Sequence, residues 1–477
     1  MPLLSNYPQL KVIQDIVREK NTAVHLVGGF LRDFCLGVEK KDFDFAVQNN
    51  ALNVAEIFSN RIRGAYVLLD EQRGCARVIK KIKGSAYTFD FADFRQRTLR
   101  RDLGSRDFTI NTLSLDISKL RESTEVPDIL KDSLSGLKDI EEKCIKRVSV
   151  QSIQDDPLRM MRAFSLKALL GFKIESETLK QIRKEKALIN NVSPERVREE
   201  LFKILESPKA APVLRAMDRV GLLEAIMPQI RIMRDCKQGT YHHLDVWPHS
   251  LETVSQMEKI FRQFRKDEEI SAYIHETLGG NHSRKAIMKL AALLHDIGKP
   301  DTRKKEKGKV SFHSHEHVGK SIVTCIAKML KLSRMERYAL EDMVRWHLRP
   351  GYLSNFKNPS ERAVYRYFRD AGEEDISILL LSLADQRSTC GPATTQRDQD
   401  HHEEICLKLV QRAFEKRNEK PFLRLINGDD LIRSLKIKPS PVFTSILNEI
   451  EEQQNLGKIK TKKEALVLAR EIVCRKQ

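Results

Sequence analysis

The sequences LVGGFLRD at residues 26–33 and DFDFAV at residues 42–47 decide the fold expected for the first part of this chain. An apolar run leads into two glycines and a helical pattern, and the second segment alternates acidic with apolar residues. Because side chains alternate along a strand, Asp42 and Asp44 should lie on one face and the phenylalanines on the other. Two carboxylates so close together repel unless a cation lies between them, and Mg2+ is a hard cation that binds oxygen ligands.

Three further segments have the composition of strands: AVHLV (23–27), ARVIKKI (76–82) and YTFDFAD (87–93). Helical patterns and glycine-containing turns separate them, which predicts a small α/β domain. The last segment places Asp90 between two phenylalanines, and we expect it to stand beside Asp42 and Asp44 on a neighbouring strand. The alternative interpretation of these three acids is the polar face of an ordinary sheet.

The glycine pair Gly28 and Gly29 lies where the first strand should turn into a helix. Glycine lets a phosphate approach backbone N–H groups, and the start of a helix favours negative charge. Arg32 would add a charge-assisted fork to the same phosphate. A glycine pair by itself more often marks only a tight turn.

From about residue 150 apolar residues return at three- and four-residue spacing, as in DPLRMMRAFSLKALLGF (156–172) and PERVREELFKILE (194–206). This pattern predicts an α+β chain, in which a small α/β head with a mixed sheet precedes an elongated all-α part. We place the boundaries near 150, 235 and 400, so that the expected segments are 1–150, 151–235, 236–400 and 401–477.

Composition suggests a polyanionic partner, because 84 Lys and Arg against 66 acidic residues leave a net charge of +18 in 477 residues. Good solvation is the simpler explanation of such a charge. Eight scattered cysteines without a CxxC pair indicate a reducing compartment. The start lacks a signal-peptide pattern, and we see no apolar run of about 18 residues that would cross a bilayer. We therefore expect a cytoplasmic protein without a membrane partner.

The sequence DDPLR at residues 155–159 predicts a helix start, since Asp before Pro commonly caps a helix. Asp156 and Arg159, three residues apart, would then share a face of that helix. A carboxylate beside a guanidinium offers the acceptors and donors that reading the edge of a nucleobase requires. A capping Asp paired with an Arg is the structural alternative.

Histidines form a second constellation in HHLDVWPH (242–249) and in LLHDIGKP (293–300), where an adjacent His and Asp precede a Gly-Lys-Pro stop. These segments resemble the HD phosphohydrolases, and with a later aspartate that resemblance implies a mixed nitrogen and oxygen ligand set suited to magnesium or a transition metal. That set is His249, His295, Asp296 and Asp385. His315 and His347 are candidates for a second metal position.

GGFLRD followed by DFDFAV resembles the head of the class II tRNA nucleotidyltransferase and bacterial poly(A) polymerase superfamily. RDFTIN (106–111) is similar to the motif that handles triphosphate and ribose, although Ser105 replaces the first arginine of the family's RRDFTIN. DDPLR resembles the nucleotide-selecting motif of that family, and the His and Asp pattern resembles the HD phosphohydrolases. INGDDLI (426–432) and IKPSP (437–441) are similar to the RNA-holding tail.

The resemblance implies a nucleotidyltransferase head, then neck helices that select nucleotides and bind RNA, an HD-type metal-binding domain and an RNA-binding tail. It implies two-metal phosphoryl transfer with Mg2+, in which Asp42, Asp44 and Asp90 are catalytic. Expected partners are ATP, CTP and the tRNA 3′ end, for CCA addition or repair. The expected nucleotide-binding residues are Gly28, Gly29, Arg32, Arg106, Asp107, Asn111, Asp156, Arg159 and Arg162.

Several alternatives stay open at this point. The short connection between Phe94 and Arg106 leaves CC-only or A-only addition open, and poly(A) polymerases share the same head. The HD site would hold Mg2+, Mn2+ or Ni2+ and hydrolyse phosphoesters, 2′,3′-cyclic phosphates included. In a different class of protein, the HD phosphohydrolase is the working enzyme and the head is an RNA-binding module.

Overall fold

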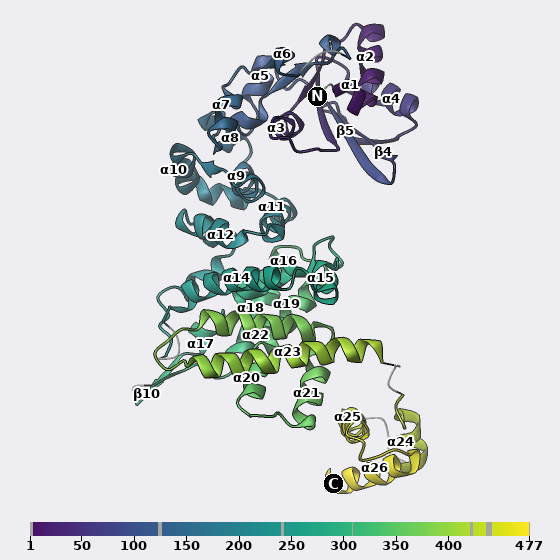
Figure 1. The fold of residues 1–477 in the computed structure, drawn as a ribbon, viewed down its shortest axis with the longest axis vertical. Coiled ribbons are helices and arrows are strands. Elements are labelled where there is room, and N and C mark those ends of the chain that lie inside the picture. The colour runs from purple at the N-terminus through teal and green to yellow at the C-terminus, as the bar shows by residue number, and fades with distance from the viewer. Residues whose placement is uncertain are drawn as a thin grey trace. The chain divides into compact units, whose positions relative to one another are not determined.

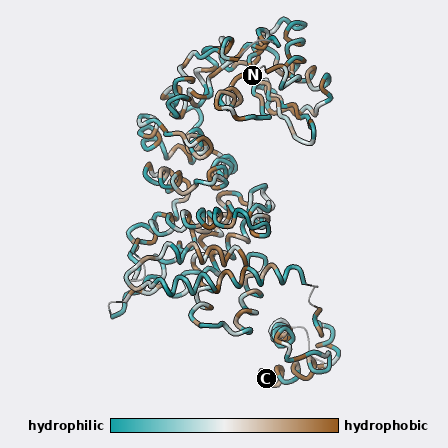
Figure 2. The backbone as a smooth tube through the Cα atoms, in the orientation of Figure 1, coloured by the Kyte–Doolittle hydropathy of each residue, from teal (hydrophilic) through white to brown (hydrophobic). Residues whose placement is uncertain are grey.

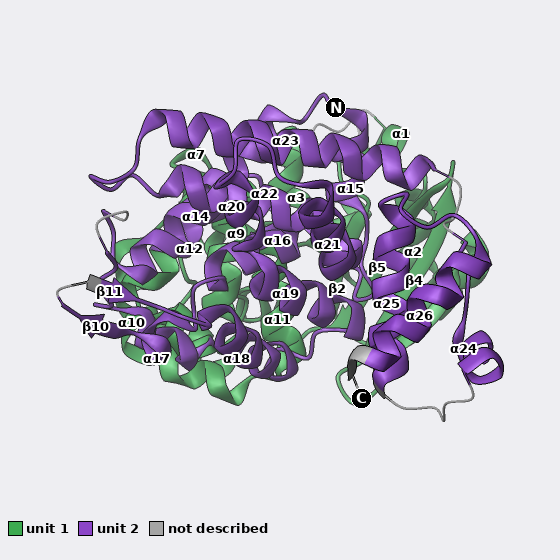
Figure 3. Ribbon diagram, turned by 90° about the horizontal axis from the view of Figure 1, so that it is seen from below, with its two compact units in different colours: residues 1–204, 216–226 green, residues 205–215, 227–477 purple. Residues whose placement is uncertain are grey.

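The computed structural model describes residues 3–122, 126–239, 243–307, 309–419, 423–435 and 441–476. Two compact units make up the chain: residues 1–204 with 216–226, and residues 205–215 with 227–477 (Figure 3). The four-part division expected from the sequence stays a prediction.

The first unit contains a seven-stranded sheet in the order β3-β4-β5-β2-β1-β6-β7. Its strands β4 and β5 are labelled in Figure 1. β2 runs parallel to β5, while the other strand pairs of this sheet are antiparallel among the described residues, so the predicted mixed sheet is confirmed. The strands are β1 (Val24–Val27), β2 (Asp42–Val47), β3 (Ala65–Asp70), β4 (Cys75–Ile82), β5 (Ser85–Asp93), β6 (Ser114–Asp116) and β7 (Leu130–Lys131). The four strands expected from the sequence are present, and the outer strands β3, β6 and β7 add to them.

Aromatic side chains hold one face of this sheet. Phe43 stacks on Phe89 at 5.0 Å between ring centroids, and Phe45 stacks on Phe91 at 4.9 Å, all of them buried. Phe58 of α4 (Ala51–Ile62) packs against both phenylalanines of β5, and α2 (Gln9–Lys20) packs on α4. Stacked rings and buried apolar area anchor the strand register, so the acidic side chains of β2 and β5 must point to the other face.

Helices occur before and between the strands of the sheet and make up most of the chain after it, with hydrophilic and hydrophobic residues alternating along the chain trace (Figure 2). In the first part of the chain they are α1 (Leu3–Asn6), α3 (Gly29–Cys35), α5 (Leu99–Gly104), α6 (Val126–Ile129), α7 (Gly136–Glu141), α8 (Val150–Asp155), α9 (Arg159–Leu170), α10 (Ser176–Glu185), α11 (Pro194–Glu206), α12 (Ala210–Arg219) and α13 (Leu222–Ile226). The pair β8 (Cys144–Ile145) and β9 (Lys173–Ile174) is parallel. Two-residue strands carry no periodic signal, which is why the sequence did not reveal them.

The second unit begins with a helical bundle around α22 (Asp375–Ser388), which is buried over most of its length. The other helices of this part of the chain are α14 (Val246–Gln263), α15 (Glu268–His275), α16 (Arg284–Leu294), α17 (Lys299–Thr302), α18 (His315–Met329), α19 (Arg334–Trp346), α20 (Arg349–Ser354), α21 (Glu361–Ala371) and α23 (Gln396–Asn418). A small hairpin of β10 (Lys304–Glu306) and β11 (Lys309–Ser311) departs from the expected all-α pattern.

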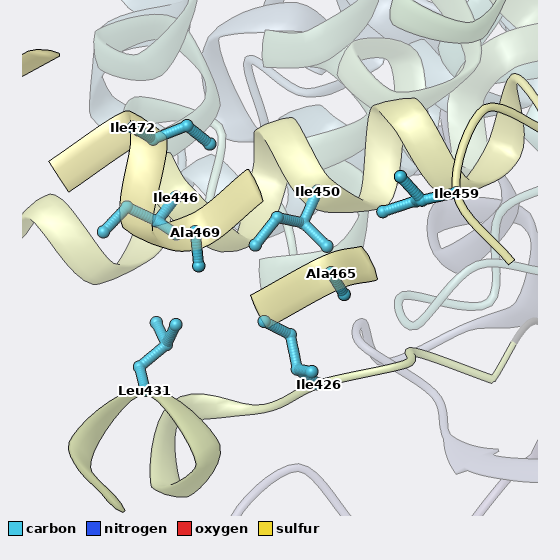
Figure 4. Packing of buried hydrophobic residues seen from close by; sticks show 8 residues of the cluster. All are labelled: Ile426, Leu431, Ile446, Ile450, Ile459, Ala465, Ala469 and Ile472. Carbon is cyan, nitrogen blue, oxygen red and sulfur yellow. The ribbon is translucent and has the colours of Figure 1, made fainter. Parts of the chain in front are cut away.

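Three helices at the C-terminal end enclose a separate small core: α24 (Gly428–Leu435), α25 (Pro441–Asn455) and α26 (Lys462–Lys476). Isoleucines dominate this core, and Ile446, Ile450 and Ile472 are almost entirely buried (Figure 4). Among the described residues, each helix is too short or too polar to span a membrane.

Candidate active site and metal centre

The three predicted catalytic carboxylates lie together on the open face of the head sheet. Strand register places Asp44 directly opposite Asp90, and Asp42 opposite Thr88, whose hydroxyl donates a hydrogen bond to the Asp42 carboxylate. The expectation that Asp90 stands beside the first pair is therefore confirmed. Phe43 fills the other face, as the period of two requires.

Gly28 lies against this cluster because β1 pairs with β2 and brings Val27 opposite Asp44. Its backbone has φ +82° and ψ −147°, a conformation that is essentially restricted to glycine. A Cβ at this position would lie 2.7 Å from Asp44 Oδ2 and 3.3 Å from Arg106 Nη1. The absence of a side chain at Gly28 therefore lets its backbone lie close to the Asp44 carboxylate and the Arg106 guanidinium.

Arg77 of β4 is a partner of the site that the sequence interpretation missed. Its Nε and Nη2 donate to the two carboxylate oxygens of Asp90, each at 2.7 Å. The signal was in the turn: Lys83 and Gly84 both have positive φ, as a two-residue hairpin needs, and this turn sets Arg77 opposite Asp90. The bidentate pair fixes the orientation of Asp90.

Electrostatics favour a cation between the acids. Asp44 is open to solvent on the sheet face. Surrounding protein nevertheless raises its pKa by desolvation, and Asp90 and Asp42 raise it further against the opposing effect of Arg106. Neighbouring carboxylate oxygens on one accessible face are a donor set that fits a divalent cation of the Mg2+ type.

Asp107 and Asn111 form a buried network with Arg32. Arg32 donates from Nη1 to Asn111 Oδ1 at 2.7 Å and from Nε to Asp33 at 2.8 Å. Asn111 donates in turn to Asp107 Oδ1 at 3.0 Å. Because Arg32 is 5% exposed and paired within the protein, its contact with a phosphate stays a prediction.

Arg162 of α9 completes this network from the neck. Its Nε and Nη2 each lie 2.9 Å from Asp107 Oδ2, and its Nη1 lies 3.8 Å from Glu200 of α11. Burial opposes ionisation of Asp107, yet Arg162 and Asn111 outweigh it and lower the Asp107 pKa. The charge of Asp107 in turn raises the pKa of Arg162.

The structure separates Asp156 from Arg159, contrary to the expected shared helix face. α9 begins at Arg159, while Asp156 lies before it in an extended conformation and pairs with Arg196 Nη2 at 2.8 Å. Arg159 is buried, and its guanidinium donates to the backbone carbonyls of Ser105, Arg106 and Ser152 at 2.8 to 3.0 Å. The carbonyls of Ser105 and Arg106 belong to the loop that carries Arg106, and that of Ser152 belongs to α8, so Arg159 ties this loop to α8 in this structure.

A second site lies inside the helical bundle, where six side chains form two adjoining triads. His249, His295 and Asp385 make one triad, and Asp296, His315 and His347 make the other. Asp296 faces both, because its Oδ2 lies 3.1 Å from His295 Nε2 and its Oδ1 lies 3.3 Å from His315 Nε2. The four predicted ligands and the two candidate histidines are therefore brought together.

Backbone contacts aim the imidazoles at the centre of this second site. His295, His315 and His347 each place Nδ1 within 3.0 Å of a carbonyl oxygen three residues earlier. A carbonyl can accept but not donate, so Nδ1 carries the proton and Nε2 presents its lone pair in the neutral ring. His315 Nε2 and His347 Nε2 lie 3.3 Å apart, an arrangement that suits two ligands of one metal ion.

The charge balance of this site also fits a cation. Burial disfavours protonation of His295, but Asp296 and Asp385 raise its pKa to about 10. The same aspartates have their pKa values held well below normal by the histidines and Lys299, despite burial. Negative charge strong enough to hold a proton on a buried imidazole also attracts a divalent cation.

Lys299 is a second residue that the sequence interpretation passed over. Its Nζ lies 2.6 Å from Asp296 Oδ2 and donates to Gln238 Oε1 at 2.6 Å. It follows Asp296 by three residues across a tight turn, which was a readable signal in HDIGK. The predictions for His242 and residues 437–440 lie outside the described residues.

Four family models match the chain. They are the poly A polymerase head domain at 24–146, the probable RNA and SrmB-binding site of polymerase A at 171–233, the HD domain at 246–390, and the putative tRNA nucleotidyltransferase domain 2 at 423–469. The solved structure of a CCA-adding enzyme in apo form I aligns with this chain at a TM-score of 0.64 and 20% identity, and the alignment covers 96% of this chain and 92% of the chain of that enzyme. A Thermotoga maritima CCA-adding enzyme complexed with tRNA has a TM-score of 0.59 at 21% identity, covering 98% of this chain and 95% of its own. These structures share the fold.

Curated relatives match over almost the full length. The A-adding tRNA nucleotidyltransferase of Deinococcus radiodurans is 30% identical over 92% of this chain and 93% of that protein. The CC-adding tRNA nucleotidyltransferase of Thermus thermophilus is 28% identical over 92% of this chain and 91% of that protein. With that identity and coverage, and with a carboxylate cluster and a His/Asp centre in their expected places, the chain belongs to the class II tRNA nucleotidyltransferase family, in the form that carries an HD domain.

Proposed function

We propose that this protein adds CMP, AMP or both from CTP and ATP to the 3′ end of tRNA, in CCA synthesis or repair. The observation that carries the proposal is the register of β2 and β5, which sets Asp44 beside Asp90 and Asp42 on the sheet face next to Gly28 and Arg106. This is the arrangement needed for in-line attack of an RNA 3′-hydroxyl on the α-phosphate of a nucleotide, with loss of pyrophosphate.

Each residue has a role in this proposal. Asp42 and Asp44 would hold Mg2+, which would supply Lewis-acid stabilisation of the charge that develops on the phosphoryl group. Asp90, oriented by Arg77, directs the attacking hydroxyl. Gly28 and Gly29 keep the backbone clear for the triphosphate, while Arg32 and Arg106 balance its charge, and Asp107 and Asn111 receive the ribose. Asp156 and Arg159 select the base, and Arg162 holds Asp107 for that purpose.

The test is extension of tRNA that lacks its last one, two or three nucleotides, with CTP and ATP supplied separately and together. Product sizes on a sequencing gel show whether CC, A or CCA is added. Long A tracts on unstructured RNA without preference for tRNA would identify a poly(A) polymerase instead. Absence of any extension, with Mg2+ present and the protein folded, would contradict the proposal.

Partial CCA synthesis stays among the expected results. The segment from Phe94 to Arg106 is short and folded: Thr98 caps α5, and Leu103 is buried against Val27 and Ala46. Relatives at similar identity carry A-adding and CC-adding names, so tRNA ending in C or CC is the informative substrate.

The buried His/Asp centre supports a second activity, hydrolysis of a phosphoester that includes 2′,3′-cyclic phosphates. The two triads, which contact each other through Asp296, would hold divalent metal, for which Mg2+, Mn2+ and Ni2+ are the candidates, and the metal would supply Lewis-acid activation of the phosphoester. We expect cyclic nucleotide hydrolysis by metal-loaded protein to survive Asp42→Ala and to disappear in His295→Ala. Metal-loaded protein that leaves these substrates untouched would exclude the second activity.

A further inference from the structure

A cavity with a volume of about 200 Å³ lies where α16 packs against both α14 and α15. These three helices are labelled side by side in Figure 1. Phe261 of α14, Ile274 of α15 and Pro208 give the cavity apolar walls, and Ser271 of α15 also lines it. Pockets for drug-sized ligands have volumes of about 300–1,000 Å³, so this cavity suits a smaller molecule. None of its lining residues belongs to the head site or to the His/Asp centre.

Lys289 of α16 brings a buried positive charge to this cavity, since only 1% of the residue is exposed. Its Nζ donates to the carbonyl oxygen of Ser207 at 2.5 Å and lies 3.3 Å from Glu258 Oε1. An ammonium group carries three N–H donors, so these two acceptors among the described residues leave one donor for a ligand. Glu258 also accepts from the backbone N–H groups of Ala210 and Ala211, at 2.5 and 3.2 Å. The carboxylate beside Lys289 is therefore shared with the start of α12.

Basic residues outnumber acidic residues around the cavity. Its charged and titratable lining residues are Glu206, Glu258, Arg262, Arg265, His275, Lys285 and Lys289. Each lysine pairs with one of the glutamates, and the partner of Lys285 is Glu206, with Nζ and Oε2 3.6 Å apart. Arg262 and Arg265 are exposed, and neither forms an ion pair with a carboxylate that the structure describes. Two guanidiniums of the lining are therefore available to an anion.

We propose that this cavity binds a small organic anion, in which an apolar body of about one ring carries a carboxylate or a phosphate group. The body would lie between Phe261 and Ile274, where burial of apolar surface contributes affinity. The anionic group would accept hydrogen bonds from Lys289 and from the guanidinium forks of Arg262 and Arg265. A long polyanion would contact the arginines at the surface and leave the apolar interior empty, so the cavity favours a small ligand over nucleic acid.

The test is fluorine NMR of a fluorinated phenylacetate with the full-length protein, followed by displacement with unlabelled phenylacetate or phenyl phosphate. These two competitors distinguish a carboxylate group from a phosphate group. A ligand of roughly ten non-hydrogen atoms with ordinary ligand efficiency should bind with a Kd of about 1 mM or lower. Acetate, which lacks the ring, and benzyl alcohol, which lacks the charge, should displace the probe about tenfold less effectively.

The variant Arg262→Gln/Arg265→Gln should raise the Kd of the probe roughly tenfold, because it removes both available guanidiniums. A matched control is Lys259→Gln/Lys266→Gln, which removes the same charge from exposed lysines nearby that do not line the cavity and should keep the wild-type Kd. Ser271→Leu, which places a larger side chain in the lining, should also weaken binding. If the arginine variant melts early, Arg265→Gln alone replaces it.

Several results would overturn this site. One is a wild-type protein that does not bind the probe, and another is a Kd that is equal in the arginine variant and the lysine control. Displacement by acetate as effective as displacement by phenylacetate would show an adventitious ion only. An arginine variant that loses affinity for tRNA but keeps its affinity for the probe would assign these arginines to nucleic acid, and it would also overturn the proposal.

Discussion

Replacing Gly28 with alanine tests the geometry of the head site at its tightest point. The substitution adds one methyl group, yet that Cβ would lie 2.7 Å from Asp44 Oδ2 and 3.3 Å from Arg106 Nη1. Real Cβ atoms do not approach oxygen so closely, so Asp44, Arg106 or the backbone must move. The backbone itself is also unsuited to alanine, because φ is +82° with ψ −147°.

Two effects of different size follow. Backbone strain should cost roughly 1–3 kcal/mol of folding free energy. Displacement of the Asp44 carboxylate acts on catalysis, where a misplacement of about 1 Å commonly costs about a hundredfold in rate. We therefore expect a moderate loss of stability and a fall in kcat of about two orders of magnitude.

The assay is single-turnover incorporation of one nucleotide into tRNA, with calorimetric melting measured in parallel. Gly37→Ala is the matched control, because Gly37 has φ +71° but its added Cβ meets nothing within 4 Å. The control should lose some stability and retain its rate. A Gly28→Ala enzyme with the wild-type rate would refute the reasoning, since the Asp44 position would then not matter to the chemistry.

Three further outcomes are expected. Asp44→Ala should lower incorporation about a thousandfold, equivalent to several kcal/mol of transition-state stabilisation. It should leave the melting temperature intact, because the surrounding protein and the neighbouring carboxylates Asp90 and Asp42 already disfavour this charge. A large drop in melting temperature would contradict that reason. Arg162→Met should cost about 2 kcal/mol at pH 7 by leaving the buried Asp107 carboxylate without its guanidinium partner. Arg162 lowers the pKa of Asp107 in the folded protein, so the ion pair stabilises the fold fully above the ordinary pKa of 3.8. This stabilisation is lost as the pH falls through the lowered pKa of Asp107. The free energies of unfolding of variant and wild type, measured by denaturation, should therefore converge in acid. Gly298→Ala would place a Cβ 2.2 Å from the carbonyl oxygen of His315 in α18, and the resulting shift should reduce the metal content of the protein in metal analysis. The control Gly351→Ala, whose added Cβ meets nothing within 4 Å, should retain full metal content.

The sequence was informative about the head because its signals are local. The alternation in DFDFAV requires the carboxylates and phenylalanines to lie on opposite faces, and the observed strand has the expected bounds. The parallel pairing of β2 with β5 is different in kind. It joins residues 46 positions apart, and nothing local sets the register that brings Asp90 to Asp44.

Arginine roles were the least predictable feature. Arg32 and Arg159 look equivalent to free phosphate- or base-reading groups in the sequence, yet both are buried and donate to protein acceptors. Arg77 carries no motif, yet it holds Asp90 in a bidentate pair. A long flexible side chain chooses its partner from everything that surrounds it in space, which spacing along the chain does not encode.

By itself, the sequence determined which residue types are available and on which face of each local element they lie: the acids of β2 and β5, the glycine turn before them, and the histidines and aspartates of the bundle. Tertiary structure decided which of them meet. It set Asp296 of one triad against His295 of the other, whose members come from helices as distant in the sequence as α14 and α22. It also paired Asp156 with Arg196 and not with Arg159. The physical reason is that local periodicity follows from backbone geometry, whereas long-range contacts follow from the packing of the whole unit.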